Sequence, residues 1–66
     1  MQLTVNGRAS QVPDGTALPE LLATLGLRVG SVVVEHNGTA LLRSELPGVV
    51  LVEGDRLELV RAVAGG

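Results

Sequence analysis

The sequence predicts an α+β fold in which one main helix packs on one face of a mixed sheet of four to five strands. Three observations point to this class. Two short alternating stretches are each closed by an Asn-Gly dipeptide, a single amphipathic helical segment separates the two hairpins, and a last alternating stretch follows them. A helix on one face of a sheet buries the apolar sides of both. With 66 residues, 45% of them hydrophobic, the chain has room for one folded domain, residues 1–66.

The first hairpin is predicted from its alternation and its turn. In Met1–Val5, Leu3 and Val5 point to one side and the polar residues to the other, as in a half-buried strand. Asn6-Gly7 favours a type I′ turn, which requires positive φ at both central residues. We therefore expect Arg8–Val12 to be the returning strand.

The helical segment follows a Pro-Asp-Gly turn. Its leucines recur at the helical spacing i, i+3, i+4 and i+7: Leu18, Leu21, Leu22 and Leu25. Thr16 is the expected N-cap, because its hydroxyl can accept a hydrogen bond from a free N–H of the first turn. Gly26 is the expected C′ residue, where the chain leaves the helix in the left-handed conformation.

The second half of the chain predicts another hairpin and a last strand. Ser31–His36 contains three consecutive valines, Asn37-Gly38 is a second turn, and Thr39–Leu42 is the expected return. The apolar segment Val49–Val52 fits either a short strand or a packed crossover. Arg56–Val60 alternates again, with its leucines directed inward.

The composition excludes several classes of function. With no Cys and a single His, the chain cannot be a disulfide scaffold or a cysteine zinc protein, and no metal site is expected. With no aromatic residue and a net charge of −2, it lacks the stacking faces and the positive charge of a nucleic-acid binder. No apolar stretch reaches the length of a membrane span and no signal peptide is recognisable, so we expect a cytoplasmic protein, monomeric when free.

Catalysis by the chain itself is not expected. So small a domain cannot enclose a deep active site without losing its core, and no nucleophile with its base is recognisable. His36 is interpreted as an ordinary strand-end residue beside a turn.

The last two residues, Gly65-Gly66, allow two interpretations. They can be a frayed end. Alternatively, two residues without Cβ can thread a narrow enzyme channel in any backbone conformation, carrying an ionised carboxylate that can attack an activated phosphate.

Together with the order of the elements, this ending resembles the ThiS family of ubiquitin-like β-grasp sulfur carriers of thiamin biosynthesis. The resemblance covers essentially the whole chain. Its matching pieces are the opening strand with Asn6-Gly7, the helix segment Leu18–Gly26, the stretch Val32–Gly38, the segment at Arg43, the turn Glu53-Gly54-Asp55 and the ending Ala64-Gly65-Gly66. One departure is Leu46, which stands where relatives often carry a large aromatic residue and fills that apolar space only partly.

The resemblance implies a β-grasp domain with a flexible tail, residues 62–66, and a carrier rather than an enzyme. It implies that a ubiquitin-activating-type, ThiF-like adenylyltransferase uses ATP and Mg to adenylate Gly66. Sulfur originating from cysteine, through a desulfurase, would convert Gly66 to a thiocarboxylate for a ThiG-like thiazole synthase. Ala64, Gly65 and Gly66 would thread the partner's active site.

A partner is expected to contact the last strand. The expected contacts are Arg56, Leu59, Arg61 and Val63. The apolar runs Val32–Val34 and Val49–Val52 either contribute to such a partner face or belong to strands buried on both sides.

Other functions stay open at this stage. The same tail chemistry would serve a carrier for molybdopterin, cysteine or tRNA thiolation. A Gly-Gly ending also suits a ubiquitin-like protein modifier, and a β-grasp interaction module with an inert end is a third possibility.

Overall fold

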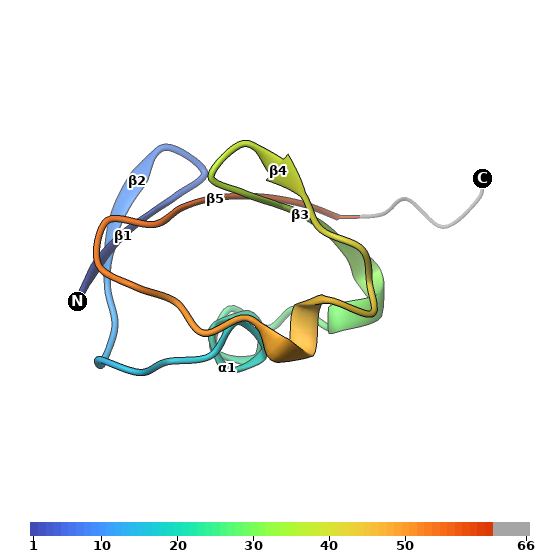
Figure 1. Ribbon diagram of the computed structural model, residues 1–66, viewed down its shortest axis with the longest axis horizontal. Helices are drawn as coiled ribbons and strands as arrows, with labels where there is room; N and C mark the ends of the chain where they lie inside the picture. The colour runs from blue at the N-terminus through green and yellow to red at the C-terminus, as the bar shows by residue number, and fades with distance from the viewer. Residues whose placement is uncertain (62–66) are drawn as a thin grey trace.

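One layer of the structure is a five-stranded mixed sheet with the order β2-β1-β5-β3-β4, and the helix α1 lies against one of its faces (Figure 1). This computed structural model describes residues 1–61, so the predicted tail, 62–66, lies outside the described residues. The strands are β1 (Gln2–Val5), β2 (Arg8–Gln11), β3 (Val32–His36), β4 (Thr39–Ala40) and β5 (Arg56–Arg61). Within residues 1–61, only β1 and β5 pair in parallel, and the other three neighbouring pairs are antiparallel. The predicted fold class is confirmed.

Both hairpin turns form as predicted. Asn6 and Gly7 have φ of 50° and 80°, and Asn37 and Gly38 have φ of 51° and 85°. Two successive residues at positive φ are the type I′ geometry that matches the twist of the paired strands.

The helix α1 (Leu18–Thr24) begins one residue later than the capping prediction required. Its N-cap is Ala17, and the Thr16 prediction is wrong. The Thr16 hydroxyl instead donates to the Pro13 carbonyl oxygen at 2.6 Å, within the turn before the helix. The Glu20 side chain provides the capping contact by accepting a hydrogen bond from the Ala17 N–H at 3.2 Å. Gly26 follows the helix at φ 75°, as predicted for a C′ residue.

The second hairpin is shorter than predicted. β4 ends at Ala40, although the Leu41 N–H still donates to the Val34 carbonyl oxygen at 2.9 Å. The Leu42 N–H then donates to the Glu45 carboxylate at 2.6 Å, which starts a turn and takes the chain away from the sheet. A short 3₁₀ turn, η2 (Leu46–Gly48), follows.

The segment Val49–Val52 is a crossover and not a strand of the sheet. It pairs with the residues just before α1, since the Leu18 N–H donates to the Val49 carbonyl oxygen and the Leu51 N–H to that of Thr16. Within residues 1–61, the one β-bridge outside the named strands joins Val50 of this segment to Ala17. The segment Val49–Val52 then leads into the turn before β5.

The core consists of leucine and valine. Its buried members are Leu3, Leu18, Leu21, Leu22, Val32, Val34, Leu46, Leu51, Leu57 and Leu59. Leu46, expected to fill its apolar space only partly, is fully enclosed, with 2% of its surface exposed. It therefore completes the core between η2 and α1.

The valine runs are half buried rather than buried on both sides. In β3, Val32 and Val34 are in the core while Val33 is 52% exposed, and in the crossover Val50 and Val52 are both 59% exposed. A second short 3₁₀ turn, η1 (Val29–Ser31), precedes β3. Among residues 1–61, no helix is long and apolar enough to cross a membrane.

Candidate functional site

The strand β5 occupies the middle of the sheet and leads directly to residues 62–66. It pairs in parallel with β1 and in antiparallel fashion with β3 over five residue pairs, from Val32–Arg61 to His36–Leu57. Its Leu57 and Leu59 side chains are buried on the face of the sheet that the helix covers. Because β5 is held by a strand on each side and by the core on one face, the point where the chain leaves the sheet is defined.

Asn6 holds the middle of β5 through its side chain. Its Nδ2 donates to the Leu59 carbonyl oxygen at 3.2 Å, and its Oδ1 accepts from the Leu59 N–H at 2.7 Å. β1 ends at Val5, because Asn6 already has positive φ. The amide group of Asn6 thus continues the pairing with β5 beyond the end of the β1 backbone ladder.

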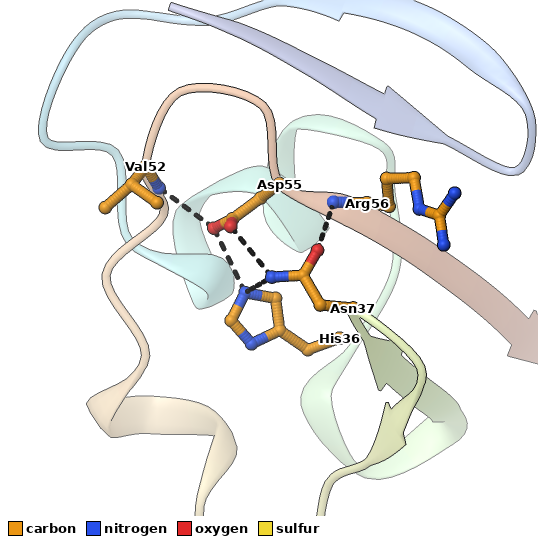
Figure 2. Close-up of polar contacts among 5 residues, drawn as sticks. All are labelled: His36, Asn37, Val52, Asp55 and Arg56. Carbon is orange, nitrogen blue, oxygen red and sulfur yellow. Dashed lines mark hydrogen bonds and ion pairs between the residues drawn. The ribbon is translucent and has the colours of Figure 1, made fainter.

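Asn37 holds the start of β5 from the other side. Its Oδ1 accepts a hydrogen bond from the Arg56 N–H at 2.8 Å, and its Nδ2 donates to Asp55 Oδ1 at 3.0 Å (Figure 2). Asn37 therefore links the second hairpin to the turn that begins β5.

Asp55 is the buried centre of this contact set, which we call the Asp55 cluster: His36, Asn37, Val52, Asp55 and the Arg56 backbone. The Asp55 side chain is 5% exposed, and its Oδ2 accepts from the Val52 N–H at 2.9 Å and lies 3.0 Å from His36 Nε2 (Figure 2). Burial by itself raises the pKa of Asp55. The hydrogen bonds from Val52, Asn37 and His36, with the charge of His36, outweigh burial and hold the pKa below its usual value of 3.8.

His36 is thus more than the strand-end residue that the sequence suggested. It donates to, or pairs with, a buried carboxylate at the start of β5. Within residues 1–61, no group of three or more His, Cys, Asp or Glu side chains is arranged to hold a metal ion. The contacts of the Asp55 cluster fix the turn that directs β5.

The predicted contact residues on β5 fall on different sides of the strand. Arg56 is exposed on the open face of the sheet, where Val60 is 61% exposed and stands opposite Val33. Arg61 is exposed too, but it lies an odd number of residues after Arg56, so its side chain is on the other face of the sheet. There it lines a surface groove with Arg8 and Leu25. Arg56 and Arg61 consequently do not border one surface.

Leu59, the third predicted contact, belongs to the core. It is 8% exposed and lines the floor of the groove beside Arg61. Val63, Ala64, Gly65 and Gly66 lie outside the described residues.

Sequence reasoning did not find the roles of Asn6, Asn37 and Asp55. The turn motifs were visible as Asn-Gly and Glu-Gly-Asp, yet turn formation alone accounts for those residue types. One signal was available: both hairpin turns carry Asn at a position where Gly or Asp would also permit the turn. Unlike those residues, Asn has an amide that can both donate and accept hydrogen bonds across strands.

The sheet order with its single covering helix and central parallel pair defines the ubiquitin-like β-grasp fold. A model of the ThiS family matches residues 2–66, and the chain belongs to this family.

The proteins similar to this chain include two solved structures and one longer protein. A crystal structure of the thiamine biosynthesis protein ThiS from Geobacter metallireducens is 35% identical, with a TM-score of 0.83 and full coverage of both chains. An NMR solution structure of a thiamine biosynthesis protein from the same organism is also 35% identical, with a TM-score of 0.80, covering this chain fully and 88% of the other. A thiazole synthase from Paramagnetospirillum magneticum is 32% identical over 66 residues, and this chain spans 20% of its length.

Proposed function

We propose that this protein is a sulfur carrier of thiamin biosynthesis that holds sulfur as a thiocarboxylate on Gly66 and delivers it to a thiazole synthase. The observation that carries the proposal is the ThiS family match, which extends through Gly65-Gly66. The support of β5 by Asn6 and by the Asp55 cluster fits this role, because a carrier must present its reactive end from a defined point of a rigid domain.

The chemistry proposed for Gly66 has two stages. Its carboxylate attacks the α-phosphorus of ATP, pyrophosphate leaves, and an acyl-adenylate forms. A persulfide sulfur, derived from cysteine by a desulfurase, then attacks the acyl carbon and displaces AMP. A further thiol cleaves the resulting acyl disulfide, leaving the thiocarboxylate on Gly66 and a disulfide on the donor.

The proposal assigns catalysis to partners. A ubiquitin-activating-type, ThiF-like enzyme would bind ATP and Mg, and a ThiG-like thiazole synthase would receive the sulfur. The second partnership is supported by the thiazole synthase from Paramagnetospirillum magneticum, since one-fifth of that protein resembles this entire chain. A domain of this kind and a thiazole synthase therefore occur in one polypeptide.

The test is the intact mass of the protein after incubation with ATP, Mg, a ThiF-like enzyme, a cysteine desulfurase and cysteine. We expect an increase corresponding to one oxygen-to-sulfur exchange, located in the C-terminal peptide. A variant lacking Gly66 is the control and should stay at its starting mass. An unchanged mass of the complete chain contradicts the proposal, and attachment to lysines of other proteins would identify a modifier instead.

The receiving pathway is tested with the loaded protein. Mixed with a thiazole synthase, its sugar-phosphate substrate and the nitrogen-bearing co-substrate that completes the ring, it should lose sulfur as thiazole phosphate appears. Sulfur retention there, with release to a molybdopterin or tRNA-thiolating system, would place the carrier in another pathway.

A further inference from the structure

Three of the five arginines line one continuous surface groove. Its larger part, of about 440 Å³, lies between the end of α1 and the β1, β2 and β5 strands, and includes Arg8 and Arg61. Its smaller part continues past Gly26 and includes Arg28. Leu27 and Arg61 line both parts, so the two are contiguous. We call it the arginine groove.

The charge of the arginine groove differs from that of the whole chain. The chain carries seven acidic residues and a net charge of −2, yet no Asp or Glu lines either part of the groove. Arg8, Arg28 and Arg61 are exposed, and within residues 1–61 none of them forms an ion pair. Their guanidinium groups are thus available to a ligand that carries negative charge.

The floor of the groove is apolar. Leu25 belongs to the predicted helical stripe but is 47% exposed, because the helix has ended and nothing in residues 1–61 covers it. Val5 and Leu27 beside it are partly buried. A surface with an apolar floor and arginine at its rim has the composition typical of a protein–protein contact site.

From this charge complementarity we infer that the arginine groove binds an acidic segment of a partner protein, with one large apolar side chain seated against Leu25 and Leu27. Carboxylates of that segment pair with Arg8, Arg28 and Arg61. The inference deepens the proposed function, because Arg61 is the last residue before 62–66 and an enzyme acting on Gly66 must dock nearby. A nucleic acid fits less well, since the chain offers no aromatic side chain for stacking and the floor is aliphatic.

The first test needs no sulfur transfer and is therefore independent of the proposed function. The probe is an acetylated and amidated hexapeptide, Glu-Leu-Glu-Glu-Leu-Glu, titrated into isotope-labelled protein while amide NMR shifts are recorded. We expect shifts concentrated at Arg8, at residues 25–31 and at Arg61. The uncharged peptide Gln-Leu-Gln-Gln-Leu-Gln should produce much smaller ones.

Matched variants separate the groove from the general charge of the protein. Arg28→Glu should weaken peptide binding about tenfold or more, whereas Arg43→Glu makes the same charge change at an exposed arginine that does not line the groove. Leu25→Ala should weaken binding several-fold, and Leu42→Ala, at a leucine 68% exposed outside the groove, is its control.

Three results would overturn the inference. They are shifts that map to the open sheet face, equal weakening by Arg28→Glu and Arg43→Glu, and stronger shifts at the groove with a thymidine oligonucleotide than with the peptide. If the protein also accepts sulfur, Arg28→Glu should raise the KM for the adenylating enzyme about tenfold with little change in kcat. Normal sulfur loading without peptide binding rejects only the inference that the groove binds an acidic segment. Peptide binding without sulfur loading rejects only the carrier function.

Discussion

The two Asn-Gly turns of this protein have the same backbone conformation and contact the same strand, yet they support it in different ways. Asn6 makes two hydrogen bonds to the backbone of one residue, Leu59, so its amide acts as an additional strand residue. The Asn37 side chain bonds both the Arg56 backbone and the buried carboxylate of Asp55. The first turn thus contributes a local extension of the sheet, while the second belongs to a charged network that depends on pH.

The comparison shows that one dipeptide can serve two structural purposes, set by what lies across from it. It also separates two parts of β5: the start depends on electrostatics, and the middle depends on neutral hydrogen bonds.

Loss of the Asp55 carboxylate should have the largest effect. Asp55→Ala leaves the Val52 N–H, the Asn37 amide and His36 without their buried acceptor, which we expect to lower the free energy of unfolding by about 3 kcal/mol. A domain of this size has a total of roughly 3 to 10 kcal/mol. Urea unfolding followed by far-UV circular dichroism is the measurement, because the chain has no aromatic fluorophore. A loss below about 1 kcal/mol would show that the cluster does not hold the turn.

The pH dependence of stability should distinguish the start of β5 from its middle. Asp55 has a pKa below 3.8 in the folded protein, so its carboxylate stabilises the fold fully above the unfolded pKa. That contribution disappears as the pH falls through the lowered folded pKa. We therefore expect the free energy of unfolding to fall more steeply below about pH 4 in the wild type than in Asp55→Asn. Asn6→Gly should retain the wild-type slope, and equal slopes in wild type and Asp55→Asn would contradict the assignment.

Glycine at each turn isolates the side-chain bonds, because Gly keeps the positive φ at no steric cost. Asn37→Gly should cost about 2 kcal/mol and Asn6→Gly about 1 kcal/mol, since only the former removes a partner from a buried charge. Amide hydrogen exchange should locate the two effects, with faster exchange at Arg56 in the first variant and at Leu59 in the second. Exchange that accelerates equally at both positions would mean that the two turns act as one unit.

Removal of His36 should have the smallest effect. Its side chain is 24% exposed, and Asp55 keeps two other donors, so His36→Gln should cost about 0.5 kcal/mol. Thermal unfolding at neutral pH is sufficient to measure this change. A loss as large as that of Asp55→Ala would instead make the imidazole the principal partner of the carboxylate.

Much of the fold could be predicted because its signals are local. The alternation in Met1–Val5 and Arg56–Val60, the leucine spacing of α1 and the glycine after it depend on residues a few positions apart. Where predictions failed, a competing contact decided. The Thr16 hydroxyl bonds within its own turn, and the Glu45 carboxylate takes the Leu42 N–H and shortens β4.

The candidate site was less predictable from the sequence. Arg56 and Arg61 were expected at one partner face, but the alternation of β5 sends them to opposite faces. Arg8 and Arg28 gave no sign of a shared role, since 20 positions separate them, and the fold brings both to one groove.

The sequence alone therefore determined the elements, their order, the two I′ turns and the Gly-Gly ending, because periodicity and turn chemistry are properties of neighbouring residues. The tertiary structure decided which side chains meet. Asn6 bonds Leu59 across 53 positions, and Asn37 bonds Asp55 across 18. Such pairs require β5 to lie between β1 and β3, and no local pattern specifies which backbone group lies opposite an amide.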